Sequence, residues 1–401
     1  MKTAPLLLLT ALLLPVAAPP PPPVRTAATA LSTATRHEAD SLRVWVSWPT
    51  TRPAPTRLRV HRVWPTGREA PWPDSVTLRP VGPQQAMLVV ARRHLLPTPG
   101  ATGAATATPD RLRLRESAVA GGPDAPAPTD VPVTGAALDR TYALTDTAQR
   151  VLTRAWLHTD EVVRLSTFGL ELPLTLFRYN ADFQPALPPM AVGAAPGTAP
   201  TLTVAASRSV GARDTFSLRQ PGLYALRQGT SGPLDPLLVE DGGFPDVRTA
   251  PDLIRPLIYL TTAQERQALY DAPDPKKATD RFWLDIAGGQ PETARTLIRT
   301  YYGRVAEVNR LYSCHKPGWM TDRGMLWIVL GPPPRVEPTP DGEDWVYKEV
   351  ADTGGGRFRF RRRPSVFAPD QYELRRERGF EEVWYAATAQ WRRGVAVTAV
   401  R

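Results

Sequence analysis

The sequence predicts an α+β protein, in which an N-terminal all-β, sandwich-like region precedes a C-terminal domain of helices and an antiparallel sheet. Two observations predict this class. Proline is abundant, at 45 of 401 residues, and proline disfavours helix interiors and central strands. Up to about residue 248, apolar residues recur with a period of two, which is typical of strands. From Pro251 onward they follow the spacing of helices.

Residues 1–30 are interpreted as a signal peptide and proline-rich leader. Lys2 precedes an apolar run, Ala4–Leu14, which is shorter than the roughly 20 residues that cross a bilayer. Ala28-Thr29-Ala30 matches the small-x-small pattern of a cleavage site, and the position of cleavage stays open. No cysteine follows the apolar run and no later stretch is long enough to span a membrane. We therefore expect a periplasmic or secreted protein with no lipid anchor and no transmembrane segment in the mature chain.

Strand signals between residues 38 and 248 predict a β-rich, sandwich-like region, and whether it is one domain or two stays open. Leu42, Val44 and Val46 alternate with polar or aromatic residues, and similar runs recur between turns rich in proline and glycine. Residues 19–38 are interpreted as a low-complexity linker. Residues 97–136 are mostly Ala, Thr, Pro, Gly and Asp. Because so few large apolar groups offset the entropy of ordering, we expect a mobile insertion there.

Residues 251–394 are predicted to form the C-terminal α+β domain. Thr262 and Glu265 form a capping-box pattern, which starts one helix. A helix starting at Asp274-Pro275 follows, and the third, from Pro291 to Tyr312, has one apolar face. The pattern then predicts strands over 325–330, 345–347 and 357–361 and a final helix over 380–391.

A short motif lies between the third helix and the first of these strands. It reads Gly318-Trp319-Met320-Thr321-Asp322-Arg323-Gly324, and Gly331-Pro332-Pro333 follows the predicted strand. With its aromatic flanks, this pattern resembles the GWxTD domain over roughly residues 255–394. The resemblance implies an exported or envelope protein of a family without an assigned activity.

From the residues alone, the motif has two interpretations. In the first it is a structural junction, in which Gly318 supplies backbone freedom, Trp319 is a buried anchor, and Thr321 and Asp322 bond to nearby amides. Gly331 and Pro332 would then end the following strand. In the second, Asp322 and Arg323 bind a ligand.

No catalytic residue, metal site or cofactor is predicted. The five histidines have no metal-ligand spacing. Cys314 and His315 are neighbours in sequence, which makes them a poor catalytic dyad, and Cys314 is expected to face the core at a helix end. The carboxylate pairs Glu343-Asp344 and Glu381-Glu382 are interpreted as parts of a loop and of a solvated helix face, respectively.

The formal net charge is +10, from 49 basic and 39 acidic residues. Arginine alternates with apolar residues, as in Arg357–Arg361, which is typical of the outer face of an amphipathic strand.

From the sequence as a whole we expect a non-catalytic envelope protein that binds another envelope protein, and no nucleic acid. Two alternatives stay open: a hydrolase acting on peptide or glycan with paired carboxylates, and a polyanion-binding surface protein.

Overall fold

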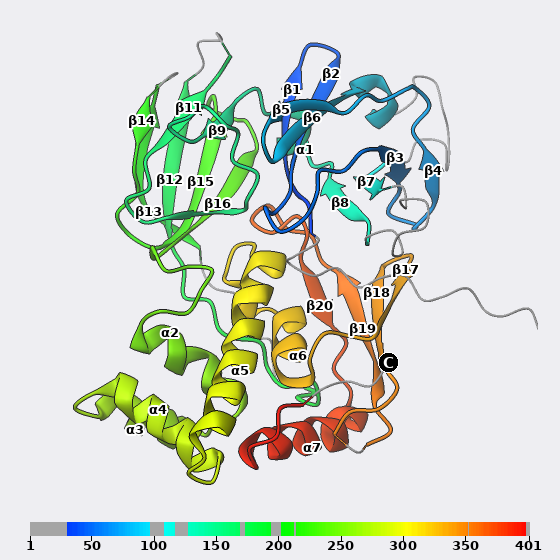
Figure 1. The fold of residues 1–401 in the computed structure, drawn as a ribbon. Coiled ribbons are helices and arrows are strands. Elements are labelled where there is room, and N and C mark those ends of the chain that lie inside the picture. The colour runs from blue at the N-terminus through cyan, green and yellow to red at the C-terminus, as the bar shows by residue number, and fades with distance from the viewer. Residues whose placement is uncertain are drawn as a thin grey trace, which may run out of the picture.

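The computed structural model describes residues 30–96, 108–116, 127–168, 173–193, 202–211, 214–351 and 353–397. Within these ranges the chain forms three bodies with separate apolar cores, and Figure 1 shows two β-sandwiches side by side above a C-terminal domain of helices and one sheet. The predicted α+β class is confirmed. The predicted signal peptide and its cleavage region lie almost wholly outside the described residues.

The first sandwich packs two four-stranded antiparallel sheets around a core of leucine, valine and tryptophan. One sheet has the order β1 (Ser32–Glu38), β2 (Ser41–Ser47), β6 (Gln85–Ala91) and β5 (Arg79–Gly82). The other has the order β4 (Glu69–Pro71), β3 (Leu58–Val63), β7 (Arg111–Glu116) and β8 (Thr129–Pro132). A 3₁₀ turn η1 (Arg92–Leu95) and the short helix α1 (Gly135–Asp139) complete it.

Two expectations for this region are wrong. The linker predicted over residues 19–38 contains the edge strand β1, and the mobile insertion predicted over 97–136 contains β7, β8 and the start of α1. Leu112 and Leu114 point into the core from β7. The average composition of 97–136 does not reveal this short alternating pattern. Once β7 pairs with β3, the burial of its leucines offsets the entropy cost of ordering the strand.

Leu112→Ala is therefore expected to lower the free energy of unfolding by about 2–4 kcal/mol, because the Leu112 side chain is fully buried. Urea denaturation followed by tryptophan fluorescence measures the change. Val89→Ala, at an exposed position of β6, is the matched control and should change it by less than about 0.5 kcal/mol. Equal urea midpoints for the two variants would contradict this packing and support the predicted mobile insertion.

The second sandwich gives the β-region predicted over 38–248 two cores. Its larger sheet has the order β10 (Trp156–His158), β16 (Leu234–Glu240), β15 (Gly222–Gln228), β12 (Leu174–Asn180) and β13 (Thr203–Val210). The smaller has the order β14 (Thr215–Phe216), β11 (Val163–Ser166) and β9 (Ala143–Thr145). The pair β10–β16 is parallel, whereas the other strand pairs of these two sheets are antiparallel.

The C-terminal domain packs helices against one face of a four-stranded antiparallel sheet (Figure 1). Its helices are α2 (Ala250–Ile254), α3 (Ala263–Asp271), α4 (Pro275–Ile286), α5 (Pro291–Tyr312), α6 (Asp322–Leu330) and α7 (Glu381–Arg392), with 3₁₀ turns η3 (Arg255–Tyr259), η4 (Gly318–Met320) and η5 (Arg378–Phe380). The sheet order is β17 (Arg335–Thr339), β18 (Gly342–Tyr347), β19 (Gly356–Arg362) and β20 (Tyr372–Leu374). The capping box of Thr262 and Glu265 is present, and the three helices predicted from caps and spacing are confirmed.

The strand predicted over residues 325–330 is wrong, since these residues belong to helix α6. All six side chains from Met325 to Leu330 are fully buried. A short, uniformly apolar run carries no period that separates a buried strand from a buried helix. The local start signal decides the matter, because the Thr321 hydroxyl accepts a hydrogen bond from the Gly324 amide and so caps a helix.

Each of the three bodies contacts the other two. Arg140 of the first sandwich forms an ion pair with Asp235 of the second, at 2.6 Å. Arg362 of β19 is paired with Asp110, next to β7. The third contact is a long excursion between β12 and β13, which crosses the C-terminal domain and is described below.

Candidate functional site: the GWxTD motif and the segment it holds

The motif forms the turn between α5 and α6. The Thr321 hydroxyl donates to the Gly318 carbonyl oxygen at 2.7 Å and accepts from the Gly324 amide at 3.1 Å. Asn309, in the last turn of α5, accepts from the Trp319 amide at 3.0 Å. These bonds fix η4 at the start of α6, so the interpretation as a structural junction describes Thr321 well.

Two motif glycines are required by close packing. A Cβ at Gly318 would overlap the Val308 carbonyl oxygen and lie 2.9 Å from the Asn309 Cα. A Cβ at Gly324 would overlap the Gly318 carbonyl oxygen. The expectation that Gly318 supplies backbone freedom is therefore wrong, because its place in the fold depends on space: α5 passes against it.

Trp319 differs from the predicted buried anchor, since its side chain is only half-buried at the edge of the core. Its ring contacts that of Tyr259 at a centroid distance of 6.4 Å, and the Tyr259 hydroxyl donates to the Trp319 carbonyl oxygen at 2.8 Å. Burial raises the pKa of Tyr259, with Asp322 adding to the effect, so that hydroxyl stays a neutral donor.

Asp322 connects the motif to the sheet. Its carboxylate accepts from the Leu374 amide of β20 at 2.8 Å and pairs with the Arg376 guanidinium at 2.6 Å. The side chain is 11% exposed. Asp322 therefore fixes the position of Arg376, and the turn bonds that the sequence interpretation gave to Asp322 belong to Thr321.

Arg323 is enclosed by aromatic rings. Its guanidinium lies 4.1 Å from the centroid of Tyr372 and 4.6 Å from that of Tyr312, and it donates to the Asp370 carbonyl oxygen at 3.1 Å. Burial alone would lower the pKa of Arg323, but the nearby charges of Asp370 and Glu343 raise it above its ordinary value. Arg323 is thus a buried cation held by the protein itself, and the interpretation of Asp322 and Arg323 as a direct ligand pair is not supported.

Gly331 and Pro332 end helix α6 and not the predicted strand. Gly331 has a φ of +91°, which favours glycine, and its carbonyl oxygen accepts from the Tyr347 hydroxyl at 2.9 Å. Arg304 of α5 is buried beside it and donates to the Ile328 carbonyl oxygen at 3.0 Å. A cation at a helix C-terminus is favourable, although burial lowers the pKa of Arg304 to about 10. Pro332 is exposed.

Residues 183–190, here called the crossing segment, form neither helix nor strand and lie against the motif. Lys316 Nζ donates to the Gln184 carbonyl oxygen at 3.0 Å, and the Ala186 amide donates to the Met320 carbonyl oxygen at 3.0 Å. Two more backbone oxygens are bound: Arg376 donates to that of Leu187 and the Glu377 amide to that of Pro189, each at 3.1 Å. The groups of the motif that face outward therefore hold a polypeptide backbone.

Cys314 and His315 lie at one end of this face. The Cys314 Sγ is 3.2 Å from the His315 Nδ1, so the two neighbours do contact each other. Burial raises the pKa of the thiol, and burial together with Lys316 lowers the pKa of His315 to about 4. Both groups are neutral at neutral pH, which is the opposite of the thiolate–imidazolium pair that nucleophilic catalysis uses. Cys314 lines the cavity described next and does not face the core.

A cavity of about 1050 Å³ lies where the three bodies meet. Its walls come from β1, from α1 and β8, from β16, from the end of α5, and from residues 364–370. Most of the lining side chains are apolar, including Leu31, Leu152, Leu237 and Val366. Its main polar group is a closed cluster, in which Asp235 accepts from both Arg140 and Tyr142.

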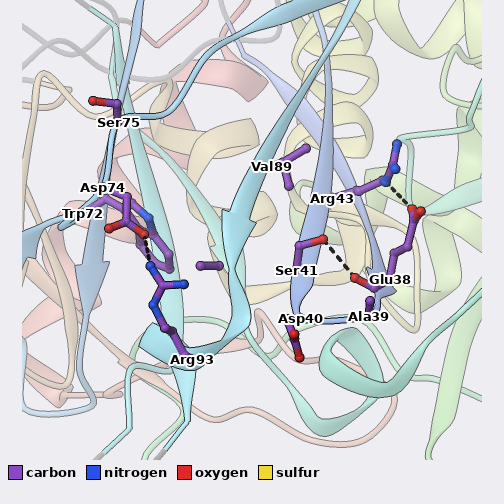
Figure 2. Close-up of a pocket in the computed structure, with 11 residues that line it drawn as sticks. Glu38, Ala39, Asp40, Ser41, Arg43, Trp72, Asp74, Ser75, Val89 and Arg93 are labelled. Carbon is purple, nitrogen blue, oxygen red and sulfur yellow. Dashed lines mark hydrogen bonds and ion pairs between the residues drawn. The ribbon is translucent and has the colours of Figure 1, made fainter.

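A second hollow, of about 440 Å³, lies on the first sandwich (Figure 2). Asp74 and Arg93 form an ion pair on one side of it, and Glu38 and Arg43 form another on the opposite side. Val89 lies between them. These four charged groups neutralise one another in pairs, and the Asp40 side chain also lines the hollow.

The structure thus brings Gly318, Trp319, Thr321 and Gly324 together in one turn, places Asp322 and Arg323 against the two ends of β20, and leaves Gly331 at the far end of α6. Sequence reasoning missed Arg304 and Arg376. A basic residue on the apolar face of α5 was the available signal for Arg304, but Arg376 meets the motif only through the fold.

The two sandwiches and the C-terminal domain define a multidomain α+β protein whose described part contains no helix long and apolar enough to cross a membrane. Nor do three or more His, Cys, Asp or Glu side chains gather as a metal site among the described residues. The family model of the GWxTD domain matches residues 222–393. The chain therefore contains a GWxTD domain, as its motif predicted.

Two solved structures show weak similarity. Native α2-macroglobulin from Escherichia coli, spanning domains MG0-NIE-MG1, is 11% identical, with 53% of this chain and 71% of that chain covered and a TM-score of 0.16. The pilus 2b backbone protein of group B streptococcus is 8% identical, with 55% and 93% covered and a TM-score of 0.11. A comparison with curated protein sequences found no match.

Proposed function

We propose that this GWxTD protein is exported to the cell envelope and acts there, without catalysis, by binding another protein at the cavity between its three bodies. The charged and apolar N-terminal sequence supports export. The cavity carries the binding part of the proposal, since ligand sites form preferentially where domains meet and have mostly apolar walls with a few polar groups.

The partner proposed for the cavity is a protein with a protruding apolar loop or terminus. Val366 is 59% exposed at the cavity wall. A partner that covers such apolar surface removes it from water, and this stabilises the complex. Within the wall, Asp235 is bound by Arg140 and Tyr142, and the lining arginines Arg154 and Arg310 are paired with Glu161 and Asp246 outside it. Burial raises the pKa of Tyr142 well above its ordinary value, so this cluster keeps its hydrogen bonds across the physiological range.

The hydrolase alternative needs two carboxylates free to exchange protons. Glu343 and Asp344 lie in strand β18 and not in the predicted loop, and they serve as partners of other side chains. The Glu343 carboxylate accepts from the Trp345 indole at 3.0 Å, and Asp344 pairs with Arg357 at 3.1 Å. Glu381 and Glu382 are exposed on α7, as predicted. These four residues give the hydrolase no support.

The polyanion alternative depends on uncompensated arginine. On the outer face of β19, however, Arg357 pairs with Glu337 and Asp344, and Arg359 lies 3.6 Å from Asp344. Arg361 lies 3.4 Å from Asp341. This arginine row is therefore largely neutralised by carboxylates of the same sheet.

Val366→Glu is expected to reduce recovery of the envelope partner at least about tenfold in a pull-down with tagged protein, because a buried, unpaired carboxylate opposes docking. Val81→Glu is the matched control: Val81 is 46% exposed but lies on β5, away from the cavity. Both positions are exposed, so both variants should melt like the wild type. Equal recovery with the two variants would overturn the cavity as the docking site, and partner loss that depends only on salt would favour polyanion binding.

A further inference from the structure

The connection between β12 and β13 is far longer than its two ends require. Asn180 and Thr203 are paired across these antiparallel strands, and such neighbours need only a turn of about 2–5 residues. Instead the chain leaves the second sandwich at Asn180 and passes over the GWxTD motif as the crossing segment. Long connections of this kind in compact proteins usually have a function.

The motif holds the crossing segment through its backbone. All four hydrogen bonds of the preceding description end on a backbone oxygen or amide of residues 184–189. The motif's variable position takes part in the same way, because Met320 contributes only its carbonyl oxygen. Hydrogen bonds to backbone groups can form with many different side-chain sequences.

Proline suits the crossing segment to this role. Pro185, Pro188 and Pro189 lack an amide hydrogen, and their fixed φ keeps the chain extended before it binds, which lowers the entropy cost of docking. Ala186 supplies the amide that Met320 needs. Side chains contribute as well: the Phe183 ring lies 4.7 Å from that of His315 in an edge-on arrangement, and Ala186 and Met190 pack against the apolar core of the C-terminal domain.

Asp322 links the motif to the side chains that bind the crossing segment. Its carboxylate holds the Arg376 guanidinium, which donates at the same time to the Leu187 carbonyl oxygen. The buried pair gives the arginine a fixed direction, so little side-chain freedom is lost when a peptide oxygen arrives. The motif therefore builds one end of the binding face with Met320 and orients the other with Asp322.

We propose that this face, formed by His315, Lys316, Met320, Arg376 and Glu377, is a recognition site for an extended, proline-containing segment of a partner protein. The crossing segment shows the ligand chemistry: an aromatic residue, then proline, one small residue with a free amide, and two more prolines. The partner's segment exchanges with the crossing segment. This proposal goes beyond the cavity site and stands if the cavity test fails.

The test uses a fluorescent peptide with the sequence of residues 181–192 and a full-length variant in which residues 182–192 are replaced by a Gly-Ser linker of equal length. Fluorescence anisotropy is expected to show binding to the linker variant at least about tenfold tighter than to the intact chain, whose own segment competes. In the linker variant, Arg376→Ala should weaken the peptide about tenfold. Arg363→Ala, at an exposed arginine that pairs with Glu373, should not.

A second variant keeps the test decisive if the linker variant does not fold. Ala186→Pro in the intact chain removes the one amide that Met320 accepts, so the crossing segment is released more easily and the peptide should bind several-fold tighter than to wild type. Absence of peptide binding to a folded linker variant would overturn the proposal, as would equal loss from Arg376→Ala and Arg363→Ala. Binding to the linker variant but never to the intact chain would make the segment a permanent strut, which also overturns exchange with a partner.

Discussion

Gly318→Ala is expected to unfold the C-terminal domain. The new methyl group would occupy the space of the Val308 carbonyl oxygen, and the atoms in the way are the backbone of α5, which cannot rotate aside. Relief requires α5 and η4 to separate, and this breaks the hydrogen bond between Asn309 and the Trp319 amide. Overpacking usually costs about 1–3 kcal/mol, and backbone clashes cost more, against a total stability of about 5–15 kcal/mol.

Gly303→Ala is the matched control for this substitution. Gly303 lies in α5, the helix that passes against Gly318, and a Cβ at Gly303 meets nothing within 4 Å. Alanine in an exposed helix interior is favoured over glycine by about 0.5–1 kcal/mol, so this variant should melt slightly above wild type. Thermal melts followed by far-ultraviolet circular dichroism compare the two. A Gly318→Ala protein that melts with Gly303→Ala would contradict the packed contact between α5 and η4.

Trp391→Ala is expected to lower the free energy of unfolding by about 3–5 kcal/mol, the usual cost of removing a buried tryptophan. The Trp391 indole is fully buried, donates to the Val329 carbonyl oxygen of α6 at 2.9 Å, and contacts the rings of Trp283 and Tyr301. Its loss leaves both a cavity and an unpaired carbonyl between α5, α6 and α7. Guanidinium denaturation measures the change.

Trp319→Ala is the comparison within the motif and should cost only about 1–2 kcal/mol, because a half-buried side chain removes less apolar area from water. The motif tryptophan is thus the less costly of the two to lose. If Trp319→Ala destabilises as strongly as Trp391→Ala, the original expectation of a buried anchor is correct after all.

The helices of the C-terminal domain could be predicted because their signals are local. The reciprocal bonds of Thr262 and Glu265, and Pro275 at the first position of α4, depend on residues within one turn. The apolar face of α5 repeats over many residues, so its period is unambiguous. The same reasoning predicted α7 and the strands β18 and β19.

Elements with short or averaged signals were not predicted correctly. Helix α6 was taken for a strand because Thr321 was assigned to a turn and not to a helix cap. Strand β7 was overlooked because its alternation lasts only from Leu112 to Leu114 inside a stretch of small residues. In both cases tertiary burial decides the structure, and the local pattern alone is ambiguous.

The candidate binding face could not be predicted beyond its motif. Thr321, Gly318 and Gly324 contact one another over a few residues, so the sequence placed them correctly in one turn. Arg376 and the crossing segment reach the motif from distant parts of the chain. No period or spacing in the sequence encodes such a meeting, which depends on how β20 and the second sandwich pack.

The start of the matched family region, at residue 222, has a consequence for how such a chain could arise by recombination. Gly222 begins β15, whose neighbours in the sheet are β16 and β12. A gene segment that begins there encodes two strands with one open side, and buried residues such as Leu226 would face water. Any new sequence fused ahead of it must therefore supply a pairing strand. The region matched by the family model and the second sandwich therefore have different borders.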